Sequence, residues 1–286
     1  MSKNMYEPPK VWEFLAENGG QWASINRPTA GARNENLLRK GEHPLQLYST
    51  ATPNGQKVTI LLEELLAAGV SDAEYDAWLI DITKGDQFSR GFFEINPNSK
   101  IPALVDYSVE KPIPVFESGS ILLYLAEKFG RFIPKQIDER TRCLNWLFWL
   151  QGAAPFLAGG FGHFYSYAPE KYEYSINRYA MESKRLMDVL NLYFAENEYL
   201  SGEQYSIADI ATWPWFGELA LGNLYSAGEF LSVDSYSHLK RWAKQIESRS
   251  AVKRGRLVNN IWGERLPHLP ERHSARDIDL VLGQSS

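Results

Sequence analysis

A proline in an Ile-Pro step, between a polar loop and an apolar run, constrains the fold of this chain more than any other residue. Residues 96–104 read Asn-Pro-Asn-Ser-Lys-Ile-Pro-Ala-Leu, so the Ile101–Pro102 bond leads directly into a segment with strand character. Such a step is a good place for a cis peptide bond, which exposes the N–H and C=O groups of Ile101 to an extended peptide ligand. An ordinary trans turn is the alternative.

A second stretch, residues 116–125, follows after a short gap and has the pattern of a helix N-terminus. Glu117 and Ser118 stand just before an apolar run that repeats with helical period. A helix that begins there directs free backbone N–H groups at an anion. Taken alone, the Glu-Ser pair is also compatible with a simple helix cap. The order and spacing of the two stretches favour a site that binds backbone and carboxylate groups.

The segments around these stretches predict a small sheet covered by helices. Residues 52–66 carry Pro, Asn and Gly at their start and continue as an amphipathic helix, and a second helix is expected to end near Phe129. Short apolar or alternating runs predict strands at residues 45–48, 75–80, 103–106 and 113–116, the last two as a hairpin. This order, βαβ followed by ββα, predicts a thioredoxin-like layer.

After residue 130 the pattern changes from mixed to helical. Gly and Pro in residues 130–136 predict a linker, and helical patterns continue to about Ser250. Ser206 and Asp209 match a capping box with Asp in place of Glu. We therefore expect an α/β thioredoxin-like domain followed by an all-α domain. The expected boundaries are an irregular N-terminal arm (1–44), the α/β domain (45–130), a linker (131–138), the all-α domain (139–262) and an irregular C-terminal arm (263–286).

Composition argues against several classes of protein. A chain of 286 residues with 44% hydrophobic content is able to bury the cores of about two domains. A net charge of -5 and the lack of a long basic stripe argue against nucleic acid as a partner. The sequence has no apolar signal core at its start and no apolar run of membrane-spanning length, so we expect a cytoplasmic protein without membrane association. No metal is expected, because no His, Cys and Asp cluster has ligand spacing.

The single cysteine limits the redox chemistry of the chain itself. One cysteine, Cys143, excludes an internal disulfide and a Cys-x-x-Cys centre. It shares a helical stripe with Trp146, Leu147 and Leu150, which is the pattern of a core-facing side, so we expect a structural role for it. Any thiol chemistry must therefore come from a bound small-molecule thiol.

The two stretches, in this order, resemble the thioredoxin-like half of the glutathione transferase superfamily. In that superfamily a cis-proline loop pairs with the cysteinyl backbone of glutathione, and an acid-Ser step holds its γ-glutamyl end. The resemblance covers roughly residues 45–250. The strings at residues 26–28, 52–57 and 149–156 resemble one subgroup, the bacterial Nu-class transferases, which act as glutathione-dependent disulfide-bond reductases. This subgroup is related to the globular domain of the fungal nitrogen-regulator prion protein.

The resemblance implies roles for individual residues. Thr52 and Asn54, with Asn26 reaching in from the N-terminal arm, would surround the sulfur of glutathione as the catalytic groups. Hydrogen bonds to a thiolate and the N-terminus of a helix both lower the pKa of a thiol, so no protein nucleophile is needed. Helix capping by Thr52 and Asn54 is a compatible alternative. The other residues implied for binding glutathione as co-substrate are Pro53, Gln87, Lys100, Ile101, Pro102, Glu117 and Ser118.

The same resemblance implies a second glutathione, bound by the helical domain. Its residues would be Gln151, Tyr174, Asn177 and Arg178, with the Arg178 guanidinium paired with a carboxylate. Two glutathiones with facing sulfurs suit thiol–disulfide exchange, with small disulfides as substrates and organic hydroperoxides as weaker ones. A transferase that conjugates electrophiles and a glutathione-binding regulator remain open alternatives. The resemblance also implies a homodimer.

Overall fold

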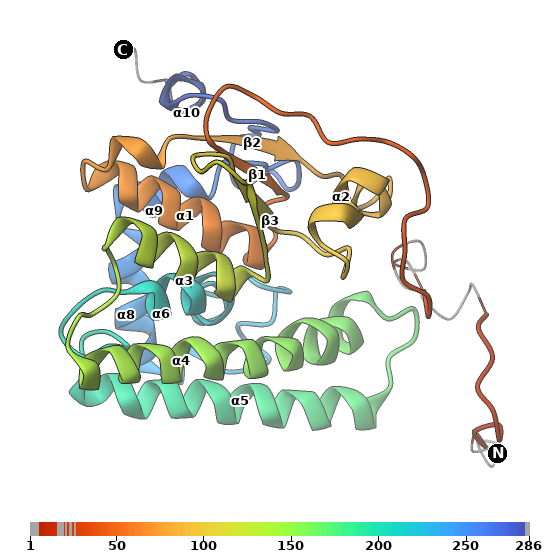
Figure 1. Ribbon diagram of the computed structural model, residues 1–286. Coiled ribbons are helices and arrows are strands. Elements are labelled where there is room, and N and C mark those ends of the chain that lie inside the picture. Colours follow the sequence, from red (N-terminus) through yellow and green to blue (C-terminus); the bar gives the residue numbers. More distant parts are fainter. Residues whose placement is uncertain (1–5, 16–19, 21, 23–24, 26, 284–286) are drawn as a thin grey trace.

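The chain folds into an α/β layer that lies against a bundle of helices. The computed structural model describes residues 6–15, 20, 22, 25 and 27–283. Figure 1 shows the sheet on one side of the molecule and the long helices α4 and α5 on the other. Residues 27–44 run along the outside of the α/β layer before entering β1 (Figure 1). Backbone hydrogen bonds from Arg33 to Phe88 and from Arg90 to Asn34 attach this segment to the layer.

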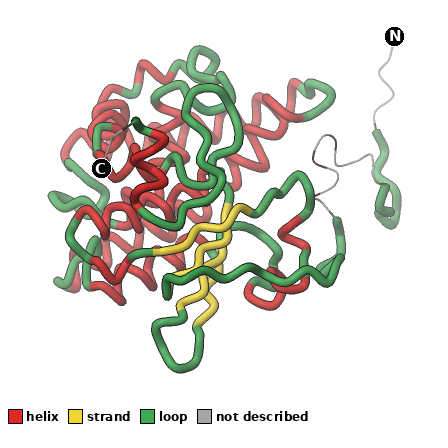
Figure 2. Tube along the Cα trace, turned by 90° about the horizontal axis from the view of Figure 1, so that it is seen from above, coloured by secondary structure: helices red, strands yellow, loops and turns green. Residues whose placement is uncertain are grey.

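A four-stranded sheet with the order β2-β1-β3-β4 forms the centre of the α/β layer, and Figure 2 shows its strands side by side. The central strand β1 pairs in parallel with β2, with Leu47 opposite Ala77, and antiparallel with β3, with Leu47 opposite Leu104. The predicted strands and the hairpin are present; β1 runs on to Ser49, and β2 ends at Leu79. The strands are β1 (Leu45–Ser49), β2 (Tyr75–Leu79), β3 (Ala103–Asp106) and β4 (Ile113–Phe116).

The two faces of the sheet are buried by different elements. Leu47 and Leu104 belong to a large core that continues through α1 (Pro53–Ala67) and α3 (Ser118–Phe129) into the helical domain. Tyr48 and Ala103 point to the other face, where α2 (Arg90–Ile95) supplies Phe92 to a smaller core. This alternation of neighbouring residues follows from the period of a strand. The α/β layer and the helices therefore share one continuous core.

The second domain is all helical, as expected, although its first helix begins inside the predicted linker. Glycine is required where α9 crosses α1, since a Cβ atom at Gly255 would lie 2.7 Å from the backbone of Ile60. None of the helices in the described part of the chain is long and apolar enough to cross a membrane. The helices are α4 (Ile137–Pro155), the π-helical η4 (Phe156–Tyr167), α5 (Glu173–Glu196), α6 (Ile207–Thr212), the π-helical η5 (Trp213–Gly217), α7 (Glu218–Ala220), α8 (Ser237–Glu247) and α9 (Ser250–Gly255). Short 3-10 turns are η2 (Ser71–Ala73), η3 (Asp86–Phe88) and η6 (Val233–Ser235).

The predicted capping box opens α6 and has a folding role. Asp209 accepts a hydrogen bond from the Ser206 backbone N–H at 3.0 Å, and the Ser206 hydroxyl accepts one from Ala208 at 3.3 Å. Asp209 also accepts from the backbone of Leu200 and from the indole of Trp242, each at 2.9 Å. Burial raises the pKa of Asp209 to about 6, although these hydrogen bonds lower it. The box therefore ties α6 to α8 in the core.

The C-terminal arm is more regular than expected. Residues 263–274 lack a helix or strand, but α10 (Ala275–Val281) follows, so the expectation of an irregular arm was wrong for this part. The reason is a second capping box, in which Asp277 accepts from the backbone of Ser274 at 2.8 Å. The arm is anchored to the sheet by Arg272, which is fully buried on the ring of Tyr75 and pairs with Glu63 at 3.3 Å.

Candidate functional site

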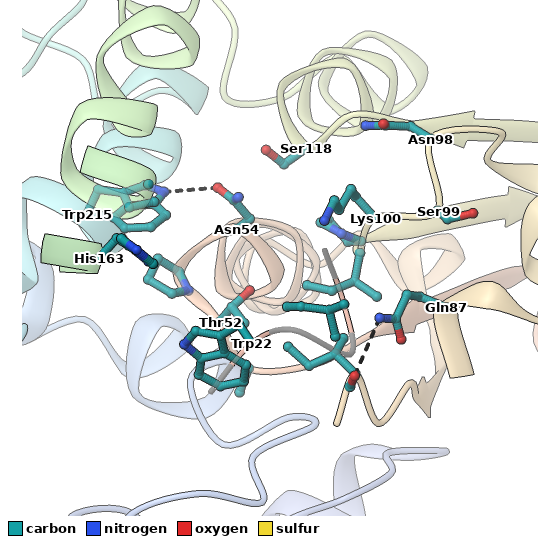
Figure 3. A pocket seen from close by; sticks show the side chains of 18 of the residues that line it. Trp22, Thr52, Asn54, Gln87, Asn98, Ser99, Lys100, Ser118, His163 and Trp215 are labelled. Atoms are coloured by element: carbon teal, nitrogen blue, oxygen red, sulfur yellow. Dashed lines mark hydrogen bonds between the residues drawn. The ribbon is translucent and has the colours of Figure 1, made fainter. Parts of the chain in front are cut away.

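A cavity of about 780 Å³ opens between the α/β layer and the helical domain. One wall is polar and comes from the ends of α1, β3 and α3. The other wall is aromatic and comes from the N-terminal arm, η4, η5 and residues 225 and 262; Figure 3 shows Trp22, His163 and Trp215 of this wall. Its lining residues are Trp22, Ile25, Ala51, Thr52, Pro53, Asn54, Ile82, Gln87, Asn98, Ser99, Lys100, Ile101, Pro102, Glu117, Ser118, Ala158, Gly159, His163, Tyr167, Trp215, Tyr225 and Trp262.

The N-terminus of α1 supplies two polar groups to the cavity. Thr52 is the N-cap, and its hydroxyl accepts a hydrogen bond from Gly55 N–H at 3.4 Å. Only glycine fits at residue 55, because a Cβ atom would lie 2.0 Å from the Thr50 carbonyl oxygen. Asn54 does not cap the helix with its side chain; its Oδ1 accepts from Trp215 Nε1 at 2.9 Å (Figure 3). Since an indole N–H only donates, the Asn54 amide must present its NH₂ group to the cavity.

The cis-proline loop forms the middle of the polar wall. The Ile101–Pro102 bond is cis, as predicted. The Asn96 side chain holds the loop by two hydrogen bonds: it donates to the Lys100 carbonyl at 2.6 Å and accepts from Asn98 N–H at 2.9 Å. Ser99 has a φ of 52°, and its buried hydroxyl has no partner within the described structure.

The β4–α3 turn forms the third part of the polar wall. Glu117 adopts a φ of 69°, a region that is costly for a residue with a side chain and is concentrated at functional sites. Its carbonyl accepts the first helical hydrogen bond, from Ile121 at 2.9 Å. No side chain caps α3 within the described residues, so the N–H groups of its first turn remain available to an anion beside Ser118.

Two side chains extend the polar wall at its outer end. Gln87 is buried and donates to the Ile82 carbonyl at 3.4 Å, while its Oε1 atom has no partner in the part of the chain that is described (Figure 3). Lys100 lies at the cavity, where desolvation and the charge of Arg33 lower the pKa of its ammonium group. Both residues had been predicted, and both could contact a polar ligand.

A buried lysine behind this wall was not predicted as a functional residue. Lys57, on α1, is fully buried, and its Nζ atom donates to the Ser118 hydroxyl at 3.2 Å. Burial lowers the pKa of Lys57 to about 7, and the charge of Glu117 opposes this shift. The sequence carried only a weak signal for this role, which is that Lys57 lies within the amphipathic pattern of the first helix. Because lysine is rarely buried, that pattern alone did not indicate a buried functional group.

The aromatic wall is held together by ring contacts. Trp22 meets Tyr167 edge to face at 5.7 Å between ring centroids, and Tyr167 meets Tyr225 at 5.8 Å. Burial raises the pKa of both tyrosines, so their phenols remain neutral. His163 lies among these rings and faces the α1 N-terminus (Figure 3).

Some predicted site residues do not line the cavity. Gln151 lies against Gly119, since a Cβ atom added at Gly119 would be 2.8 Å from the Nε2 atom of Gln151. Gln151 is therefore next to the first turn of α3. Asn177 and Arg178 are exposed and Tyr174 is 83% exposed, and none of the three lines the cavity. Asn26 lies outside the described residues.

The arrangement offers two places for negative charge on one ligand. The N-termini of α1 and α3 both open on the cavity, with Thr52 and Asn54 at the first and Ser118 at the second. Each helix end carries a partial positive charge and free N–H groups. The edge of the cis-proline loop, which offers backbone groups, lies on the same wall. Within the described residues, no group of three His, Cys, Asp or Glu side chains could hold a metal.

Two family models match the chain. The glutathione S-transferase N-terminal domain matches residues 43–127, and the glutathione S-transferase C-terminal domain matches residues 155–250. The first matched range falls on the α/β layer and the second falls on the helical domain.

Individual relatives are similar over three quarters of the chain or more. The disulfide-bond oxidoreductase YghU of Escherichia coli is 61% identical over 279 residues, covering 98% of this chain and 97% of the relative. A crystal structure of glutathione transferase YghU from Streptococcus pneumoniae, complexed with glutathione, is 56% identical with a TM-score of 0.88, covering 90% of this chain and 99% of that one. A glutathione transferase from Burkholderia graminis, with two glutathione molecules bound per subunit, is 41% identical with a TM-score of 0.69, covering 75% and 88%.

Proposed function

The chain belongs to the glutathione S-transferase family, and on that premise we propose that it is a Nu-class enzyme that reduces small disulfides with glutathione, and organic hydroperoxides more weakly. The names of the Escherichia coli relative and of the Burkholderia structure support this proposal. The observation on this chain that carries it is the pair Thr52 and Asn54 at the helix terminus, together with the burial of Cys143 away from the cavity wall.

The first glutathione would lie along the polar wall. Its γ-glutamyl carboxylate would bind the Ser118 hydroxyl and the N–H groups of α3, and its ammonium group would face Glu117. The cysteinyl backbone would pair with Ile101, and the sulfur would then reach Thr52 and Asn54. Gln87 and Lys100 are placed to contact the remaining polar groups of the tripeptide.

The protein would act by stabilising the thiolate of glutathione. The Thr52 hydroxyl accepts from Gly55 N–H and so keeps its own proton for the sulfur, and the Asn54 NH₂ group is available because Trp215 holds the amide oxygen. Hydrogen bonds to the charged form and the partial positive charge of the α1 N-terminus both lower the thiol pKa. The attacking species is therefore present at neutral pH.

The exchange would proceed in two balanced steps. The first thiolate attacks one sulfur of the substrate disulfide, the sulfur–sulfur bond breaks, and the departing thiolate takes up the proton that glutathione lost. The second glutathione, also as a thiolate, then attacks the glutathione sulfur of the mixed disulfide. Oxidised glutathione forms and the second substrate thiol leaves, so two glutathiones supply the two electrons.

Calorimetric titration with reduced and oxidised glutathione tests this proposal. Two reduced molecules per chain, or one oxidised molecule that competes for the same place, is the expected result. Thr52→Ala and Asn54→Ala should retain binding and reduce turnover, since these groups act on the sulfur. A single reduced site would favour conjugation, and absence of binding would overturn the assignment and favour a role as regulator.

Conjugation of electrophiles is the second candidate, favoured by the aromatic wall. Trp22, Tyr167 and Tyr225 offer apolar surface beside the expected position of the sulfur, which suits a flat electrophile. Glutathione turnover with chlorodinitrobenzene, compared with turnover of a small disulfide, separates the two activities. The disulfide is expected to be the better substrate.

A cytoplasmic homodimer is the assembly that we propose. Phe148 on α4 and Met181 on α5 are 65% and 63% exposed, which gives these helices apolar surface for a second copy. A disulfide reductase that consumes reduced glutathione suits the cytoplasm, where the glutathione pool is kept reducing. Sedimentation of the purified chain should give the mass of a dimer, and a monomer would contradict this assembly.

A further inference from the structure

Lys57 is a buried lysine that the proposed chemistry at the sulfur does not use. Its side chain comes from α1 and reaches the first turn of α3, where Nζ donates to Ser118 Oγ at 3.2 Å. The residue is 0% exposed, and this is the one hydrogen bond of its ammonium group within the described structure. An ammonium group has three donors, so a buried one with a single neutral partner is poorly compensated.

The direction of this hydrogen bond matters for the ligand. A lysine ammonium group only donates, so the Ser118 oxygen accepts from it and the Ser118 proton must point elsewhere. Ser118 lines the cavity at the α3 N-terminus, where its proton is available to an anion. Lys57 thus stands directly behind the hydroxyl that faces the ligand, and a positive charge there makes that hydroxyl a stronger donor.

Glu117 is the charged group that acts on Lys57 among the described residues. On the elements packed against α1, the other charged side chains mostly have partners of their own. Arg254 pairs with Glu63 and Asp279, Lys128 pairs with Asp106, Glu127 pairs with Arg140, Asp209 is bound by Trp242 and Ser206, and Asp72 and Lys253 are exposed. The balance of charge around Lys57 is therefore set by Glu117 and by whatever anion occupies the cavity.

We propose that Lys57 is a positioning residue for the ligand carboxylate, which it holds through Ser118, and that it takes up a proton when glutathione binds. This rests on the proposed function, because it assigns the γ-glutamyl carboxylate to the α3 N-terminus. In the empty protein, burial keeps the pKa of Lys57 near 7, so the group is largely neutral in mildly basic solution. A carboxylate on the far side of Ser118 favours the charged form.

Calorimetric titration of the wild-type chain with S-methylglutathione tests this proposal. The methyl group removes the thiol proton, so ionisation of the sulfur does not contribute to the proton balance. At about pH 8, in buffers of different ionisation enthalpy, uptake of close to one proton per chain is expected. Affinity should also fall roughly tenfold as the pH rises from about 7 to 8.5, because a neutral lysine must be charged on binding.

The matched variants are Lys57→Met, which removes the charge and keeps most of the volume, and Lys253→Met, which makes the same change at an exposed position of α9. Lys57→Met should weaken S-methylglutathione at least tenfold near pH 6.5 and abolish the proton uptake, whereas Lys253→Met should change neither. Any proton that the ligand amino group gains or loses on binding is the same for the wild-type chain and both variants. It therefore cancels when their proton uptakes are compared.

The outcomes separate this proposal from the proposed function. Binding of S-methylglutathione without proton uptake by the wild-type chain would overturn the role of Lys57 and leave glutathione binding intact. Equal uptake by Lys57→Met would do the same. Absence of binding to the wild-type chain would overturn both. Should Lys57→Met fail to fold, the buffer and pH series on the wild-type chain decides alone.

Discussion

The wall of the cavity made by α1, the cis-proline loop and α3 is polar and is fixed by short-range backbone geometry, whereas the facing wall is aromatic and is held by contacts between distant segments. On the polar wall, Thr52 caps its own helix, and Asn96 fixes its own loop. On the aromatic wall, Trp22 meets Tyr167. A ligand would therefore be recognised by the first wall, and its reaction partner accommodated by the second.

A hydrogen bond between Trp215 and Asn54 joins the two walls. Trp215, from η5, holds the oxygen of Asn54, from α1, at 2.9 Å. Without this contact the Asn54 amide could rotate and present its oxygen, an acceptor, to a thiolate. The comparison thus predicts loss of binding and a change of stability from the polar wall, loss of turnover from the contact between the walls, and small effects from exposed residues.

The largest effect is expected from Ser118→Ala. The substitution removes the hydroxyl that faces the ligand carboxylate and leaves the Lys57 ammonium group without its hydrogen bond. Hydrogen bonds to charged groups contribute about 1.5–3 kcal/mol, so glutathione affinity should fall by roughly 10- to 100-fold. Calorimetric titration measures this loss. Ser120→Ala, an exposed change in the same helical turn, is the control and should bind like the wild-type chain.

Lys57→Met is expected to change stability in the opposite direction from binding. Its pKa in the folded, empty protein is about 7, below the ordinary value of 10.5, so burial of the charged form is unfavourable at low pH. The free energy of unfolding of the variant should therefore exceed that of the wild-type chain by a few kcal/mol at about pH 6. This difference should shrink as the pH rises from 7 to 10. Urea denaturation at both ends of that range measures it. A less stable variant at pH 6 would show that Lys57 is already compensated.

Trp215→Phe should reduce turnover more than binding. The variant keeps an aromatic ring on the wall and loses the N–H that orients Asn54. Turnover of a small disulfide should fall about tenfold, while glutathione affinity should change less than about threefold. Trp213→Phe is a matched control. The indole of Trp213 donates to the Ala243 carbonyl at 2.9 Å, so this variant loses an equivalent hydrogen bond at a residue that does not line the cavity. Equal turnover losses in both variants would point to general destabilisation.

Much of the polar wall was predictable from the sequence, because its signals are local. The cis-proline step, the Glu-Ser pair and the Thr-Pro-Asn start of α1 each lie within a few residues of the backbone groups that they position. Trp215 and Lys57 escaped prediction for a physical reason, because each acts on a residue far away in the sequence. Trp215 reaches Asn54 only when the two domains pack, and Lys57 reaches Ser118 only when α1 packs against α3. The C-terminal helix was missed although Ser274 and Asp277 carry a local capping signal.

The smallest effect on binding of the first glutathione is expected from Arg178→Ala. Arg178 is exposed at the start of α5 and does not line the cavity of the single chain. Removing an exposed charge should change the affinity for the first glutathione less than about threefold. Titration with reduced glutathione measures the effect at both proposed sites. A large loss at the second site alone would support its predicted role there.

The central claim is that bound glutathione, and no thiol of the protein, carries the redox chemistry. Glutathione-dependent reduction of hydroxyethyl disulfide by the Cys143→Ala variant tests this most directly, because Cys143 is the single cysteine and is buried in the core. The account predicts a rate equal to that of the wild-type chain and well above that of glutathione alone. Loss of activity in a folded variant, or no acceleration by either protein, would contradict it.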